Sequence, residues 1–156
     1  MKKIILLIAF IGILIVAYYA ISPIFDDIEV DDAEPSAVGE KIIVEESEVT
    51  PSVSEDLLHK VMGTSGHPAE GTVRVVQTEE GQVIRYENFS TINGPQLHVY
   101  IAKDLEAKEF VDLGPIKGTQ GNINYAVPDN VDLDEYKYVM YWCVPFGVLF
   151  NYAEVN

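Results

Sequence analysis

The stretch GTVRVVQTEEGQVIRYEN, residues 71–88, decides the fold class of this chain. It contains two runs rich in β-branched residues, 71–78 and 82–88, and the short turn between them ends at Gly81. Glycine adopts a positive φ without a steric penalty, and tight turns between antiparallel strands need that conformation. The stretch therefore predicts a β-hairpin.

The same alternation of apolar and polar residues continues to the C-terminus, and helical periodicity is missing from this part of the sequence. Turn-forming groups of glycine, proline and asparagine, such as the one at 93–95, separate the apolar runs. Besides the hairpin we expect five more strands, at residues 97–103, 110–113, 123–127, 136–144 and 148–155. About seven short strands at this spacing predict an all-β domain over residues 61–156, built as an antiparallel β-sandwich or a small barrel.

Residues 22–60 are strongly acidic and form a candidate linker. Twelve Asp and Glu residues stand against Lys41 and Lys60 there, in a chain whose formal net charge is −15. The segment has too few apolar side chains to offset the entropy of ordering, so we expect a disordered, self-repelling spacer that does not fold with the domain. At its end, residues 55–62 (EDLLHKVM) favour two helical turns, with Ser54 as the candidate N-cap.

The N-terminus carries an apolar run that begins at Ile4 and ends at Ile21, after two lysines. A helix of about 18 residues is roughly 27 Å long, which is just enough to span a bilayer. The lysines before the run and the acidic residues after it place the N-terminus in the cytoplasm by the positive-inside rule. We therefore expect a single-pass membrane anchor at residues 1–21 and an extracytoplasmic C-terminal domain. The alternative is a signal peptide cleaved after Ala20.

Cys143 is the only cysteine of the sequence, so it cannot form an intrachain disulfide. Neither face of the strand expected at 136–144 is polar, and one interpretation is a buried cysteine that fills space in the core. The other interpretations are a redox-active thiol, a metal ligand and one half of an intermolecular disulfide.

His67 is the accessory candidate. It lies in the sequence GHPAEG, between Gly66 and Pro68, in a loop of the kind that often displays functional side chains. A solvent-facing histidine with a structural hydrogen bond is the alternative interpretation.

No familiar metal or catalytic motif accompanies these residues. A blue-copper site would combine two histidines with Cys143 and a weak thioether such as Met140, but neither a histidine nor a methionine follows Cys143 in the sequence. The acidic residues at 129–135 lack the glycine and the terminal glutamate of a helix-loop-helix calcium site. We also find no nucleophile elbow and no zinc-protease helix. The sequence thus predicts no metal site and no catalytic residues, and it leaves the cofactor unknown.

Five ordered blocks of the sequence resemble the DM-thirteen domain family, a small extracytoplasmic β module. The blocks are GHPAEG at 66–71, YENF at 86–89, NGPQLHVYI at 93–101, VDLGPIKGTQGNINYAVP at 111–128 and YVMYWCVPFGVLFNYAEV at 138–155. The resemblance implies a role in electron transfer, with Cys143 as the redox centre.

Two functions follow as expectations. The first is a membrane-anchored extracytoplasmic domain in envelope redox or electron transfer, with Cys143 as the active thiol or ligand and His67 nearby. The second is a non-catalytic binding or assembly module that docks an envelope protein partner. The net negative charge argues against a nucleic-acid partner, because nucleic acids bind to concentrated positive patches. We expect no hydrolase or transferase activity.

Overall fold

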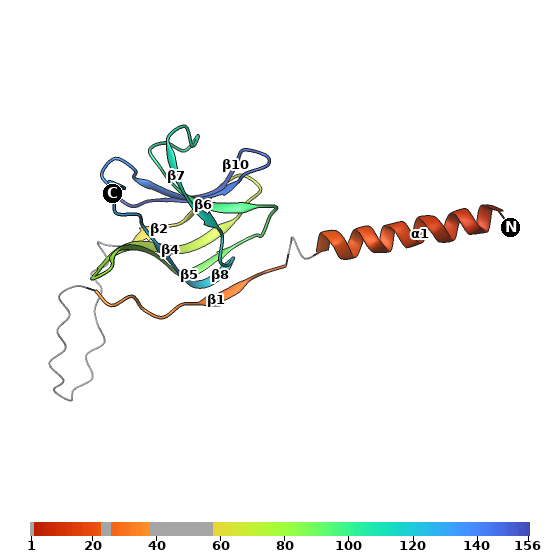
Figure 1. Ribbon diagram of the computed structural model, residues 1–156, viewed down its shortest axis with the longest axis horizontal. Helices are drawn as coiled ribbons and strands as arrows, with labels where there is room; N and C mark the ends of the chain where they lie inside the picture. The colour runs from red at the N-terminus through yellow and green to blue at the C-terminus, as the bar shows by residue number, and fades with distance from the viewer. Residues whose placement is uncertain (1, 23–25, 38–57) are drawn as a thin grey trace, which may run out of the picture.

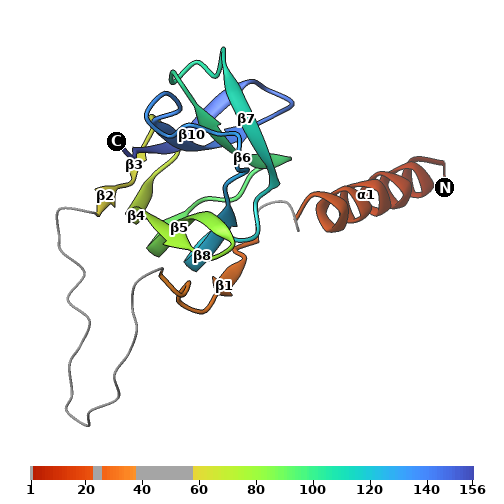
Figure 2. The ribbon, with the colours of Figure 1, turned by 60° about the vertical axis from the view of Figure 1, so that its left-hand side comes forward.

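The computed structural model describes residues 2–22, 26–37 and 58–156. Two β-sheets of five strands each pack face to face, and an N-terminal helix lies to one side of them (Figure 1). No strand belongs to both sheets among the described residues, so the domain is an open sandwich and not a closed barrel. The two layers are seen from a second direction in Figure 2.

The first sheet has the strand order β1-β8-β5-β4-β2. Its members are β1 (Glu29–Asp31), β8 (Gln120–Ala126), β5 (Gly81–Thr91), β4 (Ala69–Thr78) and β2 (His59–Lys60). β4 and β5 are antiparallel, and Thr78 pairs with Gly81 at the turn between them. The hairpin expected from residues 71–88 is therefore confirmed.

The second sheet has the strand order β3-β10-β9-β6-β7. Its members are β3 (Met62–Gly63), β10 (Val148–Glu154), β9 (Tyr138–Cys143), β6 (Leu97–Ala102) and β7 (Phe110–Pro115). β9 is the central strand, because it pairs with β10 on one side and with β6 on the other.

All seven strands expected from the sequence are present, with ends that differ by a few residues. The sandwich is the correct choice between the two architectures that the sequence allowed. β1, β2 and β3 were not expected. Each is only two or three residues long, and such a segment is too short to show an alternating pattern.

An aromatic cluster fills the core between the sheets. Tyr86 and Phe89 of β5 meet Tyr141 of β9, with ring centroids 5.5 Å and 5.1 Å from that of Tyr141. The Tyr141 hydroxyl donates to the carbonyl oxygen of Gly118 at 3.0 Å and lies 3.0 Å from the Tyr125 hydroxyl. Burial raises the pKa of Tyr141 well above its ordinary value, so the cluster stays neutral at physiological pH.

Part of the acidic segment belongs to the domain, which corrects the expectation of a disordered spacer. β1 pairs in parallel with β8, and Val30 lies opposite Gly121. Asp32 also donates its backbone N–H to the carbonyl oxygen of Asn122 at 2.8 Å. The expectation is wrong for this stretch because the edge of β8 supplies hydrogen-bond partners that composition cannot reveal. Residues 38–57 of the expected linker lie outside the described residues.

The helix expected over residues 55–62 is also wrong in its described part. His59 and Lys60 pair with β4, and Met62 and Gly63 pair with β10. This short segment therefore crosses from the edge of one sheet to the edge of the other, and strand pairing satisfies backbone groups that a helix would have satisfied internally. Residues 55–57 lie outside the described residues.

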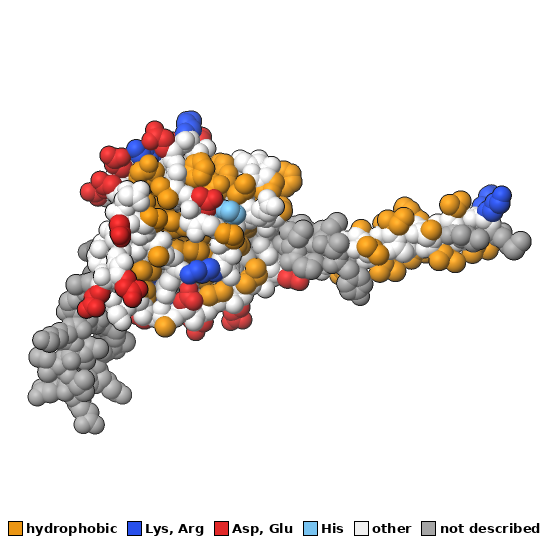
Figure 3. Space-filling model, viewed as in Figure 1, with side chains coloured by type: hydrophobic (Ala, Val, Ile, Leu, Met, Phe, Trp, Pro, Cys, Tyr) orange, Lys and Arg blue, Asp and Glu red, His pale blue; other side chains and the backbone are white. Residues whose placement is uncertain are grey.

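The helix α1 (Lys2–Ile21) is the only helix among the described residues, apart from a single residue at its end. Hydrophobic side chains cover it along its length (Figure 3), and Ile4, Leu6 and Val16 are 62%, 69% and 69% exposed. None of the helical structure within the described residues is long and apolar enough to cross a membrane. Membrane anchoring therefore stays a prediction.

Gly71 provides a test of the fold, with Gly114 as its matched control. Both have a positive φ, +113° and +100°, so an alanine at either site strains the backbone by about 1–2 kcal/mol. A Cβ at Gly71 would lie 2.8 Å from the Cα of Phe89 and 2.9 Å from two carbonyl oxygens, whereas a Cβ at Gly114 meets nothing within 4 Å.

We expect Gly71→Ala to lower the free energy of unfolding by about 1–3 kcal/mol more than Gly114→Ala, because overpacking adds to the strain. Urea unfolding, followed by the fluorescence of the single tryptophan Trp142, measures both. Equal losses would contradict the close packing of β4 on β5.

Candidate functional site

Cys143 lies at the end of the central strand of the second sheet. It pairs with Leu97 of β6 and with Val148 of β10, and only 1% of its surface is exposed. It belongs to the main core cluster together with Tyr141, two residues earlier on the same face of β9. Lys137, a basic residue close to Cys143 in the sequence, pairs with Glu154 at the opposite end of β9.

A turn at residues 93–96 covers the thiol. Cys143 donates its S–H to the carbonyl oxygen of Pro95, with 3.2 Å between sulfur and oxygen. The next residue, Val144, donates its backbone N–H to the carbonyl oxygen of Gln96 at 3.2 Å. The 93–96 turn is thus fixed to the end of β9 at two points. A reagent or partner reaches the sulfur only when this turn moves.

The same turn rests on Phe150 of β10. A Cβ on Gly94 would lie 2.8 Å from the ring of Phe150, so only glycine allows this close approach. The Phe150 ring stacks on the imidazole of His67, with the ring centroids 3.9 Å apart and the planes inclined by 28°. Phe150 therefore connects the cover of Cys143 to His67 by direct packing.

His67 is held in one orientation by Thr64. The Thr64 hydroxyl donates to the carbonyl oxygens of Leu149 and Phe150, at 2.8 Å and 3.0 Å. The hydroxyl has a single proton, and when it goes to one of these carbonyl oxygens, Nδ1 of His67, 3.1 Å away, donates to the Thr64 oxygen. In the neutral ring this tautomer leaves Nε2 without a proton. His67 thus offers a nitrogen that accepts a proton or binds a metal.

Two open pockets adjoin the 93–96 turn. One, of about 410 Å³, is lined by His67, Phe150 and the turn, together with Asp27, Gly66 and Ile92. The other, of about 470 Å³, is lined by the turn with Pro145 and Phe146. Pro95 lines both pockets and accepts the hydrogen bond of the thiol. Pro95 therefore links the Cys143 sulfur to both pockets by direct contact.

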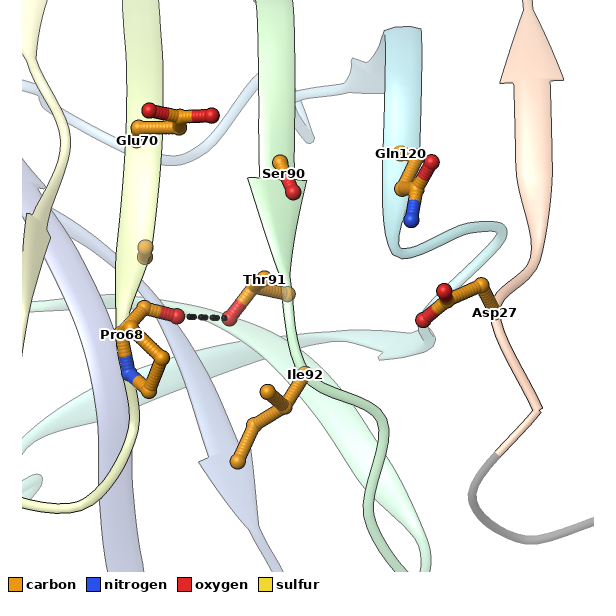
Figure 4. A pocket seen from close by; sticks show the side chains of 8 residues that line it. Asp27, Pro68, Glu70, Ser90, Thr91, Ile92 and Gln120 are labelled. Atoms are coloured by element: carbon orange, nitrogen blue, oxygen red, sulfur yellow. Dashed lines mark hydrogen bonds between the residues drawn. The ribbon is translucent and has the colours of Figure 1, made fainter.

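A third pocket of about 410 Å³ continues from the first, with which it shares Asp27 and Ile92. Figure 4 shows Asp27 on one side of it and Pro68 on the other, with the ends of β5 and β8 between them. The hydroxyl of Thr91 donates to the carbonyl oxygen of Pro68 at 3.3 Å across its floor. Its lining is mixed: the polar side chains are Asp27, Glu70, Ser90, Thr91 and Gln120, and the apolar ones are Pro68, Ala69 and Ile92.

The remaining histidines are not near Cys143. His98 lies next to Trp142 in the register and faces outward, where its Nδ1 is 2.9 Å from a carboxylate oxygen of Asp112. His59 lies on β2, at the far edge of the other sheet. Within residues 2–22, 26–37 and 58–156, no three His, Cys, Asp or Glu residues gather as a metal site would require.

Sequence reasoning selected Cys143 and His67, and it missed the groups that connect them. Thr64, Phe150 and the carbonyl oxygen of Pro95 carry no chemical signature of their own. Only their presence near or within the blocks NGPQLHVYI and YVMYWCVPFGVLFNYAEV could have drawn attention to this end of the sandwich.

Comparison with known proteins gives one match. The sequence model of the family described as Electron transfer DM13 matches residues 61–155, which is more than half of the chain and nearly all of the sandwich. No curated protein and no solved structure matches significantly. The matched region contains both sheets apart from β1 and β2, and it includes Cys143, His67 and the 93–96 turn. The chain therefore belongs to the DM-thirteen family of electron-transfer domains.

Proposed function

We propose that this chain is an extracytoplasmic electron-transfer domain, tethered to a membrane by α1, in which Cys143 is the redox group. The observation that carries the proposal is the hydrogen bond from the Cys143 thiol to Pro95, in the turn that lines two pockets. Membership of a family described by electron transfer supports it. The single cysteine of the sequence is buried at the end of β9 beneath this turn, so a partner's sulfur reaches it when the turn moves.

The redox step uses a partner's sulfur. The Cys143 thiolate attacks a disulfide of the partner, a mixed disulfide forms, and the second partner sulfur leaves as a thiolate. Attack by that thiolate on the mixed disulfide reverses the step. Alternatively, another thiol attacks the partner's sulfur in the mixed disulfide. Cys143 then leaves as a thiolate, and a new disulfide forms between the partner and that thiol. Because the chain has one cysteine, the resolving thiol comes from outside it.

His67 is the accessory group in this proposal. When Nδ1 donates to Thr64, Nε2 is the acceptor nitrogen of the neutral ring, and the ring lines the same pocket as Pro95. It is suited to take the proton that a thiol releases on entering the pocket, or to bind a metal together with groups that a partner supplies. Within the chain itself, the stacking on Phe150 fixes the ring.

The redox role is tested by trapping Cys143 in the folded full-length chain. We expect glutathione disulfide to add one glutathione at Cys143, and Pro95→Gly to speed the reaction by about tenfold or more because it loosens the cover. Mass spectrometry of the intact protein and of its peptides measures both. Cys143→Ser is the control without the thiol. If the thiol reacts only after denaturation, in the wild type and in Pro95→Gly alike, Cys143 is a packing residue and the redox proposal fails.

Membrane anchoring by α1 is a separate part of the proposal. It is supported by the apolar run from Ile4 to Ile21, the two preceding lysines and the exposed apolar side chains of the helix. We expect the chain to stay in the membrane pellet after alkaline carbonate extraction. Ile11→Arg together with Leu14→Arg should release most of it, because a charged residue at the centre of a span costs about 2.5–3.5 kcal/mol. Ile11→Leu is the neutral control. A soluble wild-type chain that lacks its first 20 residues would favour the cleaved signal peptide.

A second candidate function is a non-catalytic docking module. It is favoured by Phe146, which is 71% exposed at the β9–β10 turn, and by its neighbour Val144, which is 41% exposed. Isolated exposed apolar residues are ordinary, but Phe146 lines the 470 Å³ pocket, and Val144 precedes Pro145, which lines it too. They could form the centre of a small interface of the kind that transient complexes use.

Two substitutions separate the candidates in the native host. An electron-transfer domain should lose function in Cys143→Ser and keep at least part of it in Phe146→Ser. A docking module should show the reverse, because the buried thiol would then contribute only packing. The readout is complementation of a deletion strain, with protein levels matched by immunoblot. Loss of complementation in Cys143→Ser supports electron transfer only if the urea unfolding curve of that variant remains close to that of the wild type.

A further inference from the structure

The only two arginines of the sequence, Arg74 and Arg85, lie side by side on the first sheet. They are paired in the register of β4 and β5, and their side chains are only 11% and 6% exposed. Like charges directly opposite each other on a sheet repel, so this arrangement requires carboxylates. Glu87 provides one, with its Oε1 3.0 Å from the Nε atom of each arginine.

The second carboxylate comes from the acidic segment at residues 28–34, which we call the strap. One Glu34 oxygen pairs with Nη2 of Arg74, and the other lies 3.1 Å from Nε of Arg85. Nη1 of Arg85 also donates to the carbonyl oxygens of Asp32 and Ala33, at 3.2 Å each. The two arginines therefore recognise both the charge and the backbone of the strap.

The strap adds a strand to the edge of the first sheet. Thr119 donates its backbone N–H to the carbonyl oxygen of Ile28 at 2.7 Å, and Ile28 donates its own N–H to the Thr119 hydroxyl at 2.8 Å. β1 then pairs in parallel with β8, and Asn124 donates its side-chain amide to Ala33 at 2.8 Å. Strand addition of this kind is a recurrent way to bind an extended peptide, with affinity from the main chain and specificity from side-chain sites.

Two glycines leave room for the strap. A Cβ on Gly121 would overlap the carbonyl oxygen of Val30, and all three of its nearest heavy atoms would belong to Val30. A Cβ on Gly118 would lie 2.7 Å from Cγ2 of the same valine. The edge of β8 is thus shaped for a backbone lying against it.

The strap itself is held mostly by polar contacts. Val30 is its one residue packed against the main core cluster, whose buried members all lie within residues 61–155, and Glu34 is 58% exposed on its side chain. The strap also lies outside residues 61–155, the part that matches the family. The body of the sandwich therefore keeps its core when the strap leaves.

Removal of the strap would leave a positive site on an acidic domain. Among the described residues, Arg74 and Arg85 would then keep Glu87 as their one ion-pair partner, and Lys117, whose Nζ is 4.0 Å from a carboxylate oxygen of Asp32, would lose its own. The site would carry three positive charges and one negative charge. Its hydrogen-bonding groups and its charge both match an extended acidic peptide, and they do not match a basic or apolar one.

We propose that the edge of β8 together with Arg74 and Arg85 is a binding site for extended acidic peptides, which this chain fills with its own strap. Tethering gives the strap an effective concentration in the millimolar range, so it excludes competing peptides of moderate affinity. An acidic segment of another protein binds when the strap is weakened or removed. The site is separate from Cys143 and does not depend on the redox proposal.

The test uses a labelled peptide of residues 26–37 (DDIEVDDAEPSA) and the full-length chain. In Val30→Asp with Glu34→Lys, the strap loses its apolar contact and its ion pairs with Arg74 and Arg85, while the residues of the site on the sheet are unchanged. We expect this variant to bind the peptide at least tenfold more tightly than the wild type, by fluorescence anisotropy. Faster hydrogen exchange at the amide of Asp32 shows that the strap has left. Affinity should fall at 1 M salt, because charge carries part of the recognition.

Two controls make the result specific. Glu29→Lys changes the charge of the strap by the same amount as Glu34→Lys. The side chain of Glu29 is exposed and makes no polar contact with the described residues, so this variant should bind the peptide no better than the wild type. Addition of Gly121→Ala to the strap variant should abolish peptide binding, because the new Cβ occupies the position of the peptide backbone. The proposal is overturned if the freed site binds the peptide no better than the wild type, if Gly121→Ala has no effect, or if the strap stays protected from exchange in the double variant.

Discussion

The hydrogen bond from Tyr141 to the carbonyl oxygen of Gly118 connects the two sheets at the centre of the sandwich. Tyr141 belongs to β9 in the second sheet, and Gly118 precedes β8 in the first. Both groups are buried, so breaking this bond would leave the carbonyl oxygen of Gly118 without its hydrogen-bond donor and without access to water, at a cost of about 1–3 kcal/mol. Tyr125 of β8 joins the same hydroxyl from the other side and strengthens the connection.

This central bond also fixes the position of both sites. Cys143 follows Tyr141 by two residues and points to the same side of β9, so the place of the tyrosine determines where the thiol meets the 93–96 turn. Thr119 follows Gly118 directly and receives Ile28 at the start of the strap. A displacement of β9 relative to β8 would therefore disturb the thiol site and the peptide site together.

The sequence predicted the seven longer strands well because they show alternation and each has glycine, proline or asparagine close to at least one of its ends. The sequence did not predict β1. Its residues form a strand only by pairing with β8, where Val30 lies opposite Gly121, and these residues are far apart in the chain. Composition describes how a segment behaves alone. It cannot show that two arginines and a sheet edge elsewhere will offset the entropy of ordering it.

The candidate site, too, could be predicted from the sequence only in part. Cys143 and His67 could be selected because thiol and imidazole groups have chemistry of their own. The groups that connect them are a proline carbonyl, a phenylalanine ring and a threonine hydroxyl, which are common throughout proteins and gain meaning only from position. Pairing of the arginines with the acidic segment was equally hidden, since Glu34 is one of 25 acidic residues in the chain.

The strap and the cover of Cys143 share one side chain, Asn93. Its Oδ1 accepts the backbone N–H of Gly94 at 2.8 Å, and its Nδ2 donates to the carbonyl oxygen of Asp26 at 2.7 Å, just before the strap. Asp27 lines the same pocket as His67 and Pro95. While the strap is docked, a carboxylate therefore lies at the entrance to the thiol, and a partner that approaches there meets negative charge. Under the proposed redox function, this negative charge favours a partner whose contact surface is basic or neutral, because like charges at the entrance repel an acidic one.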